Sequence, residues 1–185
     1  MKMFSQNLHN LHIGDEYPKQ VNCVIEIPKG KNTKYEYDEK LQAFKLTRCL
    51  ISSLNYPINY GFIPQTIAQD GDPLDVLVYN HDPLDVGTIA ECRVIGILDF
   101  TDKGEIDNKI LAVPKHAPLE KYAKLSDFNI SFLKIIKHFF RIYKEDINID
   151  VQVGEWHNGK KALSIVKSAH ERYLKSVNLN NENNN

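Results

Sequence analysis

TIAECRVIGILDF, residues 88–100, is the longest strand-like segment of the chain, and β-branched and other apolar residues predominate in it. We predict that it forms a buried β-strand. Shorter segments of similar character lie on both sides, at residues 21–28, 34–38, 44–51, 75–79 and 110–113. Strand patterns therefore fill the first two-thirds of the chain.

The last third of the chain changes to a helical period. Apolar residues recur at helical spacing from Phe132 to Tyr143, which predicts an amphipathic helix over roughly residues 129–145. A strand is expected at 150–156, and Asn158 is a candidate N-cap for a final helix that ends near Val177. Short strands followed by helices favour a small β-barrel or sheet with helices packed outside, in one domain over residues 1–177. The low-complexity segment 178–185 (NLNNENNN) is predicted to be a disordered tail.

Composition excludes several classes of protein. With 23 Lys+Arg against 24 Asp+Glu, the chain lacks the basic excess of a generic nucleic-acid binder. No apolar run approaches the ~20 residues that span a bilayer, and the N-terminus has no secretory signal, so we expect a cytoplasmic protein that does not contact a membrane. Cys23, Cys49 and Cys92 are far apart and form no zinc motif, which is typical of buried cysteines in a reducing compartment.

The segment DGDPLD, residues 70–75, places three carboxylates within six residues. Carboxylates are the oxygen ligands that Mg²⁺ and Ca²⁺ prefer, and Gly71 and Pro73 favour a turn that brings them together. An EF-hand loop does not fit, because Leu74 occupies its fifth position and His81 its twelfth. A turn stabilised by Asp side chains without any metal remains an alternative.

A second acidic segment, DKGEIDNK at residues 102–109, lies between two predicted strands and is expected to be a hairpin loop. Alone it fits a solvated turn equally well. If it lies beside the first segment, four or five carboxylates face one another and can hold more than one divalent ion. Paired metal ions ~3.5–4 Å apart are a device for phosphoryl hydrolysis.

Basic and phenolic side chains complete this set. Lys34 and Glu36 alternate and so share one strand face, and Arg48 offers a planar fork for phosphate. Tyr56, Tyr60, Tyr143 and Lys144 are further candidates, although ordinary structural roles fit each of them singly.

The motif DPLDV occurs at 72–76 and again at 82–86, where it precedes Gly87; we interpret the second copy as a connecting turn without a catalytic role.

Five ordered blocks between residues 21 and 145 resemble the soluble family I inorganic pyrophosphatases. They are VIEIPKGKNTKYEYD, LTRCLISSLNYPINYGFIPQT, DGDPLDV, the spacing of Asp102, Asp107 and Lys109 followed by LAVP, and HFFRIYK. The resemblance implies an OB-like closed five-stranded β-barrel with two C-terminal helices outside it. The compact length resembles the bacterial form, which implies a homohexamer.

The resemblance also implies roles by position. Asp70, Asp75, Asp102 and Asp107 match metal ligands, and Asp72 matches the general base. The residues that match phosphate-binding positions are Lys34, Arg48, Tyr60, Lys109, Tyr143 and Lys144. Glu26, Glu36 and Tyr56 match supporting positions around the metal cluster. Lys103 departs from the acidic residue that many bacterial members carry after the position of Asp102, without affecting a matched ligand.

The implied reaction is hydrolysis of inorganic pyrophosphate to two orthophosphates. Several Mg²⁺ ions are expected per site, with Mn²⁺ or another divalent ion as a substitute, and they activate a water that attacks phosphorus directly. Asp72 accepts the proton of that water. Another metal-dependent phosphohydrolase is the alternative, although no base-stacking motif is visible. An OB-type nucleic-acid binder is a weaker alternative, because the acidic loops would repel a phosphate backbone.

Overall fold

The computed structural model describes residues 7–50, 53–116 and 118–182. Its centre is a closed barrel of five strands: β1 (Gln20–Ile27), β4 (Asn59–Ile63), β5 (Leu74–Val78), β8 (Lys109–Pro114) and β6 (Ile89–Asp102). They neighbour one another in that order, and pairing of β1 with β6 closes the ring. The β5–β8 pair is parallel and the other barrel pairs are antiparallel. The predicted closed, OB-like barrel is confirmed.

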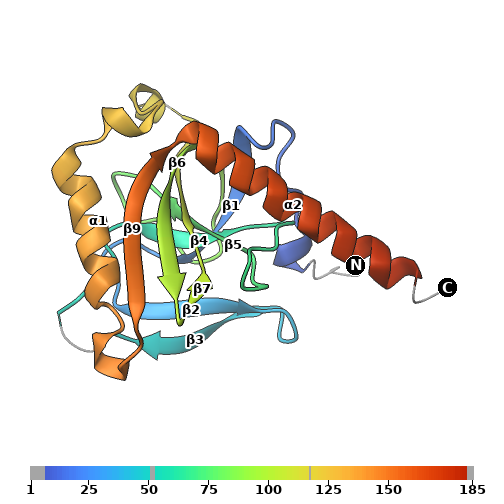
Figure 1. Cartoon of the computed structure of the whole chain (residues 1–185), viewed down its shortest axis with the longest axis horizontal. Helices are drawn as coiled ribbons and strands as arrows, with labels where there is room; N and C mark the ends of the chain where they lie inside the picture. Colours follow the sequence, from blue (N-terminus) through green and yellow to red (C-terminus); the bar gives the residue numbers. More distant parts are fainter. Residues whose placement is uncertain (1–6, 51–52, 117, 183–185) are drawn as a thin grey trace.

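The remaining strands extend from this barrel. β2 (Thr33–Asp38) and β3 (Ala43–Cys49) form a separate hairpin, which lies below the barrel in Figure 1. β7 (Glu105–Ile106) folds back on the end of β6 through Lys103 and Gly104, whose φ angles are both positive (52° and 86°), as a two-residue hairpin turn requires. β9 (Val151–Asn158) pairs with β6 outside the barrel.

Two helices pack against different parts of the barrel sheet (Figure 1). α1 (Ile130–Ile142) buries Leu133, Ile136, Phe139 and Phe140, and α2 (Gly159–Glu182) buries Ala162, Val166 and Ala169. Successive strand residues belong to two different hydrophobic clusters: Leu111 packs with the α1 residues, while its neighbours Ile110 and Ala112 pack with those of α2. The short 3₁₀ helices are η1 (Leu8–Asn10), η2 (Leu119–Lys121), η3 (Leu125–Asp127) and η4 (Glu145–Ile147).

The structure corrects the predicted end of the chain. Asn158 accepts a hydrogen bond from the backbone N–H of Lys161 at 3.4 Å, as expected of an N-cap, but α2 continues to Glu182. The prediction of a disordered tail from residue 178 is therefore wrong for residues 178–182, and residues 183–185 lie outside the described part. The other predicted helix ends at Ile142, a few residues before the expected boundary.

One barrel strand, β4, was not predicted from the sequence. Its sequence NYGFI contains Gly61, and a Cβ at that position would lie 1.8 Å from the carbonyl oxygen of Val24. Glycine in a strand weakens the strand pattern, but here it permits the close approach of β1. In the described ranges, no helix combines the length and the hydrophobicity that a membrane span requires.

Candidate active site

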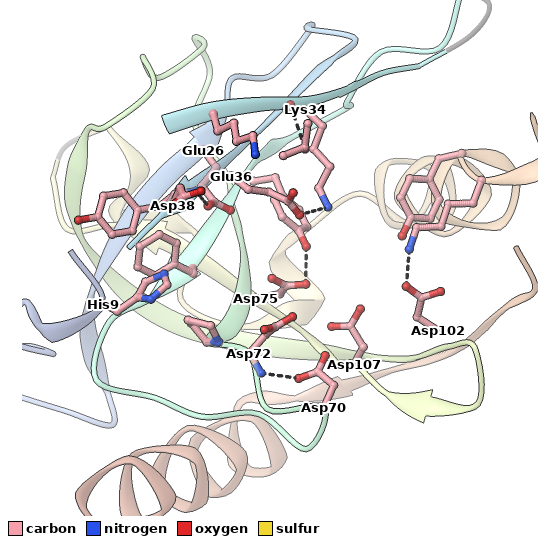
Figure 2. A pocket seen from close by; sticks show the side chains of 18 residues that line it. His9, Glu26, Lys34, Glu36, Asp38, Asp70, Asp72, Asp75, Asp102 and Asp107 are labelled. Carbon is pink, nitrogen blue, oxygen red and sulfur yellow. Dashed lines mark hydrogen bonds and ion pairs between the residues drawn. The ribbon is translucent and has the colours of Figure 1, made fainter. Parts of the chain in front are cut away.

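A pocket of about 550 Å³ opens between the barrel, the β2–β3 hairpin and the end of α1. Of the fourteen predicted site residues, eleven line it: Glu26, Lys34, Glu36, Tyr60, Asp70, Asp72, Asp75, Asp102, Asp107, Tyr143 and Lys144. Figure 2 shows Asp70, Asp72, Asp75 and Asp107 gathered in its lower part, with Asp102 towards one end and His9 and Asp38 towards the other. The two acidic segments are thus brought together.

The loop that carries Asp70 and Asp72 is held by local hydrogen bonds. The carboxylate of Asp70 accepts the backbone N–H of Asp72 at 3.1 Å, and the carbonyl of Asp72 accepts the N–H of Ala68 at 2.7 Å. Gly71 occupies the turn with φ of 94°. Where the loop enters β5, the Thr66 hydroxyl accepts the N–H of Leu74 at 2.9 Å. The same hydrogen bonds that form the turn therefore also position Asp70 and Asp72 in the pocket wall.

Asp75 and Asp107 share one buried ammonium group at the base of the pocket. Lys109, only 1% exposed, contacts both carboxylates, and its Nζ lies 2.5 Å from Asp107. Tyr60 donates its hydroxyl to Asp75. Burial alone lowers the pKa of Lys109, but the charges of Asp75 and Asp107 outweigh it and raise that pKa above the ordinary lysine value.

The pKa values of Asp75 and Asp107 are shifted in opposite directions. Burial acts to raise the pKa of Asp75, but the Lys109 ammonium and the hydrogen bonds from Lys109 and Tyr60 keep it below the ordinary value. Burial and the charge of Asp75 raise the pKa of Asp107 to about 8. One lysine therefore does not neutralise both groups, and the centre favours further positive charge.

The upper wall of the pocket comes from β1 and the β2–β3 hairpin. Lys34 Nζ lies 2.5 Å from the Glu36 carboxylate, as the alternation predicted. Glu26 accepts the backbone N–H of Tyr37 at 2.8 Å, and burial raises the pKa of Glu26 to about 8. At the far side, Lys144 pairs with Asp102, whose other carboxylate oxygen is buried without a hydrogen-bond partner.

Three predicted residues lie beside the pocket instead of lining it. Arg48 donates to the carbonyl of Tyr143 at 2.5 Å and to Asp146 at 2.7 Å, so it joins the hairpin to the end of α1. Lys109 lies beneath the carboxylates, as described above. The Tyr56 ring packs between Tyr60 and Phe139, with centroid distances of 5.8 and 4.8 Å.

Seven further lining residues were not predicted: His9, Tyr37, Asp38, Lys45, Thr47, Phe62 and Pro73. Lys45 and Thr47 alternate on β3, and this alternation next to Lys34 and Glu36 was a usable signal. His9 had no such signal, because it reaches the pocket from η1 through ring contacts with Tyr37 and Phe62 at 5.2 and 4.8 Å.

The donor set fits hard divalent cations, although no three His, Cys, Asp or Glu side chains form a ready ligand group for one ion within the described residues. The pocket gathers carboxylates in excess of ammonium groups, and Asp102 has a buried oxygen without a hydrogen-bond partner. Oxygen ligands with uncompensated charge are the donors that Mg²⁺ prefers.

Comparison with known proteins supports this chemistry. A family model described as inorganic pyrophosphatase matches residues 23–174. The inorganic pyrophosphatase of Campylobacter jejuni is 40% identical over 171 residues, which cover 90% of this chain and 99% of the relative. The soluble inorganic pyrophosphatase of Oryza sativa subsp. indica is 39% identical over 166 residues, which cover 89% of this chain and 78% of the relative.

The fold agrees with these relatives. The crystal structure of the inorganic pyrophosphatase from Thermus thermophilus matches with a TM-score of 0.88 and 40% identity, over 91% of this chain and 99% of that one. The fold is therefore shared with inorganic pyrophosphatases, and sequence similarity of about 40% identity to them extends over most of the chain. This chain belongs to the inorganic pyrophosphatase family, whose members hydrolyse pyrophosphate.

Proposed function

We propose that the chain hydrolyses pyrophosphate with the help of several Mg²⁺ ions, by direct attack of a water that the metal ions activate. The observation that supports this most is the convergence of the acidic segments 70–75 and 102–107 on one pocket with Lys34, Tyr143 and Lys144. Asp70, Asp75, Asp102 and Asp107 would hold the ions, and Mn²⁺ is an expected substitute. When bound, such ions neutralise phosphate charge and lower the pKa of water from ~15.7 towards ~7.

The protein groups divide the remaining work. Asp72 lines the pocket three residues before Asp75 and is exposed, so its carboxylate is proposed to accept the proton of the attacking water. Lys34, Lys144 and Tyr143 line the pocket and are proposed to donate to the phosphate oxygens and to compensate the charge of the leaving phosphate. Tyr60 is proposed to bind phosphate as well, for which its hydroxyl must turn away from Asp75, to which it donates in this structure. Arg48 and Lys109 are proposed to assist phosphate binding, Arg48 from beside the pocket and Lys109 from beneath it.

The supporting residues act on the shape of this wall. Glu26 joins β1 to the β2–β3 hairpin through the backbone N–H of Tyr37, Glu36 holds the ammonium group of Lys34 on the same strand, and Tyr56 packs behind Tyr60. Rigid support of this kind keeps donors and acceptors oriented for in-line attack.

The test is orthophosphate release from pyrophosphate with Mg²⁺ or with EDTA, beside ATP and a phosphomonoester. We expect rapid release from pyrophosphate with Mg²⁺ alone, little from the other substrates, and none with EDTA. Asp75→Asn should lose activity by more than about 10³-fold and weaken the Mg²⁺ dependence. Asp72→Asn should lose less, about 10²-fold, which is the lower end of the loss typical for a general base.

The sequence offers a matched control for both variants. Asp85 occupies the place of Asp75 in the second DPLDV motif, but it is exposed in the loop between β5 and β6 and does not line the pocket. Asp85→Asn should therefore retain wild-type turnover. Wild-type Mg²⁺ activation of Asp75→Asn would refute the metal assignment, and intact turnover of Asp72→Asn would refute the base.

We further propose a homohexamer in the cytoplasm that contacts neither nucleic acid nor membranes. Ile130 and Ile135 on α1 are 63% and 55% exposed, which supports burial against other copies. The free cysteines and the description of the rice relative as soluble support a cytoplasmic location. Sedimentation velocity should give six chain masses, and cell fractionation should recover the protein in the cytosol.

A further inference from the structure

The pocket is strongly acidic for a site that takes an anion. Eight of its lining residues are Asp or Glu, and three are lysines: Lys34, Lys45 and Lys144. Like charges repel an approaching phosphate, and a cation near the entrance offsets that repulsion and raises the rate of encounter. Each of the three lysines can therefore attract phosphate strongly only if its charge is not already in an ion pair with a carboxylate.

Two of these lysines are engaged. Lys34 pairs with Glu36 at 2.5 Å, and Lys144 pairs with Asp102. Lys45 forms no ion pair with any of the described residues, and its side chain is exposed on β3, where it lies opposite Glu36 in the strand register. Of the lining lysines, Lys45 alone can meet a phosphate without breaking an existing ion pair.

The acidic neighbour on the same hairpin, Asp38, forms no ion pair with Lys45 among the described residues, although the hydrogen bonds from Leu41 and Lys40 and the charge of Lys45 lower the pKa of its carboxyl. One oxygen of Asp38 accepts the backbone N–H groups of Lys40 and Leu41, each at 3.0 Å, which holds this carboxylate in the hairpin turn. His9, at the same end of the pocket, pairs with Glu39 at 2.6 Å. Figure 2 shows His9 and Asp38 at the end away from Asp102. Among the described residues that line the pocket, Lys34 and Lys144 are ion-paired, so Lys45 is the lining lysine whose charge is not in an ion pair.

We propose that Lys45 is a further substrate-binding residue, which captures the phosphate anion at the hairpin side of the pocket. This inference rests on the proposed function, because it places pyrophosphate in the same pocket. Since Lys45 is exposed and forms no ion pair with a proposed metal ligand among the described residues, it acts on capture more than on the chemical step. One charge pair at ~4 Å in water contributes about a fivefold change in affinity.

The experiment compares Lys45→Gln with Lys40→Gln. Lys40 is also exposed, and Lys40→Gln removes the same charge from the same hairpin, but Lys40 does not line the pocket. At low ionic strength we expect kcat/KM for pyrophosphate to fall about fivefold in Lys45→Gln, with kcat within twofold of wild type. Lys40→Gln should match the wild type, and Lys45→Arg should recover most of the loss.

Salt provides the second readout. At ~1 M ionic strength the screening length falls to about 3 Å, so the difference between Lys45→Gln and the wild type should shrink. Equal kcat/KM values for Lys45→Gln and Lys40→Gln would overturn the proposal. A loss confined to kcat and insensitive to salt would also overturn it, because a structural role would then explain the effect.

Failure of this inference and failure of the proposed function are distinguishable. Asp75→Asn is measured in the same assay. If it is inactive while Lys45→Gln behaves as wild type, only the role of Lys45 is wrong. If Asp75→Asn retains full activity, the pocket is not the active site and both proposals are wrong.

Discussion

Thr66 connects the acidic loop to the barrel. Valine has nearly the same shape as threonine but no hydroxyl, so Thr66→Val should measure the contribution of the hydroxyl to the stability of the fold. The side chain is 3% exposed; its hydroxyl donates to the carbonyl of Ile63 at 2.5 Å and accepts the N–H of Leu74 at 2.9 Å. Thr66→Val leaves the carbonyl of Ile63 and the N–H of Leu74, two backbone groups of buried residues, without this hydrogen-bond partner. A buried unsatisfied group costs about 1–3 kcal/mol, so we expect a loss of about 2–4 kcal/mol in the free energy of unfolding.

Thr66→Ser is the matched control. It keeps the hydroxyl and loses one methyl group, which costs about 1 kcal/mol. In urea unfolding at one fixed protein concentration, the midpoint of Thr66→Val should lie about 1 M below the wild type, with the serine variant in between. Because Leu74 directly precedes Asp75, the valine variant should also require more Mg²⁺ for half-maximal activity. Equal midpoints for the two variants would refute the proposed role of the hydroxyl.

Two further predictions concern other charged groups. Lys109→Met leaves two carboxylates, 18% and 16% exposed, without their ammonium partner, which should cost about 3–5 kcal/mol in EDTA. Mg²⁺ should raise the melting temperature of this variant more than that of the wild type, and an equal gain would contradict the metal assignment. Partial burial acts to raise the pKa of Asp99, but Lys161 and His157 hold it below its ordinary value. The stabilisation is therefore complete above the unfolded-state pKa of about 3.9 and is lost as the pH falls through the lower folded-state value. Asp99→Asn should accordingly melt earlier than the wild type at pH 7 and converge with it below about pH 4, whereas a pH-independent difference would contradict this account.

Most strands could be predicted because their residues alternate or remain apolar over several positions, as in β6. β4 could not be predicted, since Gly61 is set by the approach of Val24 from another strand, and a local pattern does not contain that contact. The extension of α2 beyond residue 177 also escaped prediction. Asn-rich composition disfavours a helix, but here the segment continues one that is already anchored by Val166 and Ala169.

The candidate site was accessible from sequence because its carboxylates occur in two short, ordered segments. The spacing of residues in the sequence could not show how deeply each side chain is buried. Lys109 and Lys45 are both lysines in strands, yet one is buried against two carboxylates and the other is exposed at the pocket wall. Asn59 shows the same limit: its side chain accepts the N–H groups of Lys29 and Leu84, each at 2.9 Å, and so joins two loops that are distant in sequence.

Closure of the barrel has a consequence for synthesis of the chain on a ribosome. β1 pairs with β4 along one edge, but the partner of its other edge is residues 89–93 of β6, and β8 must then enter between β5 and β6. The edges of β1 and β5 that pair with β6 and β8 therefore stay unpaired until residue 114 has left the exit tunnel. The acidic pocket is completed only when Tyr143 and Lys144 follow. A translational pause before residue 114 would prolong exposure of these edges to other nascent chains, whereas a pause after residue 144 would not.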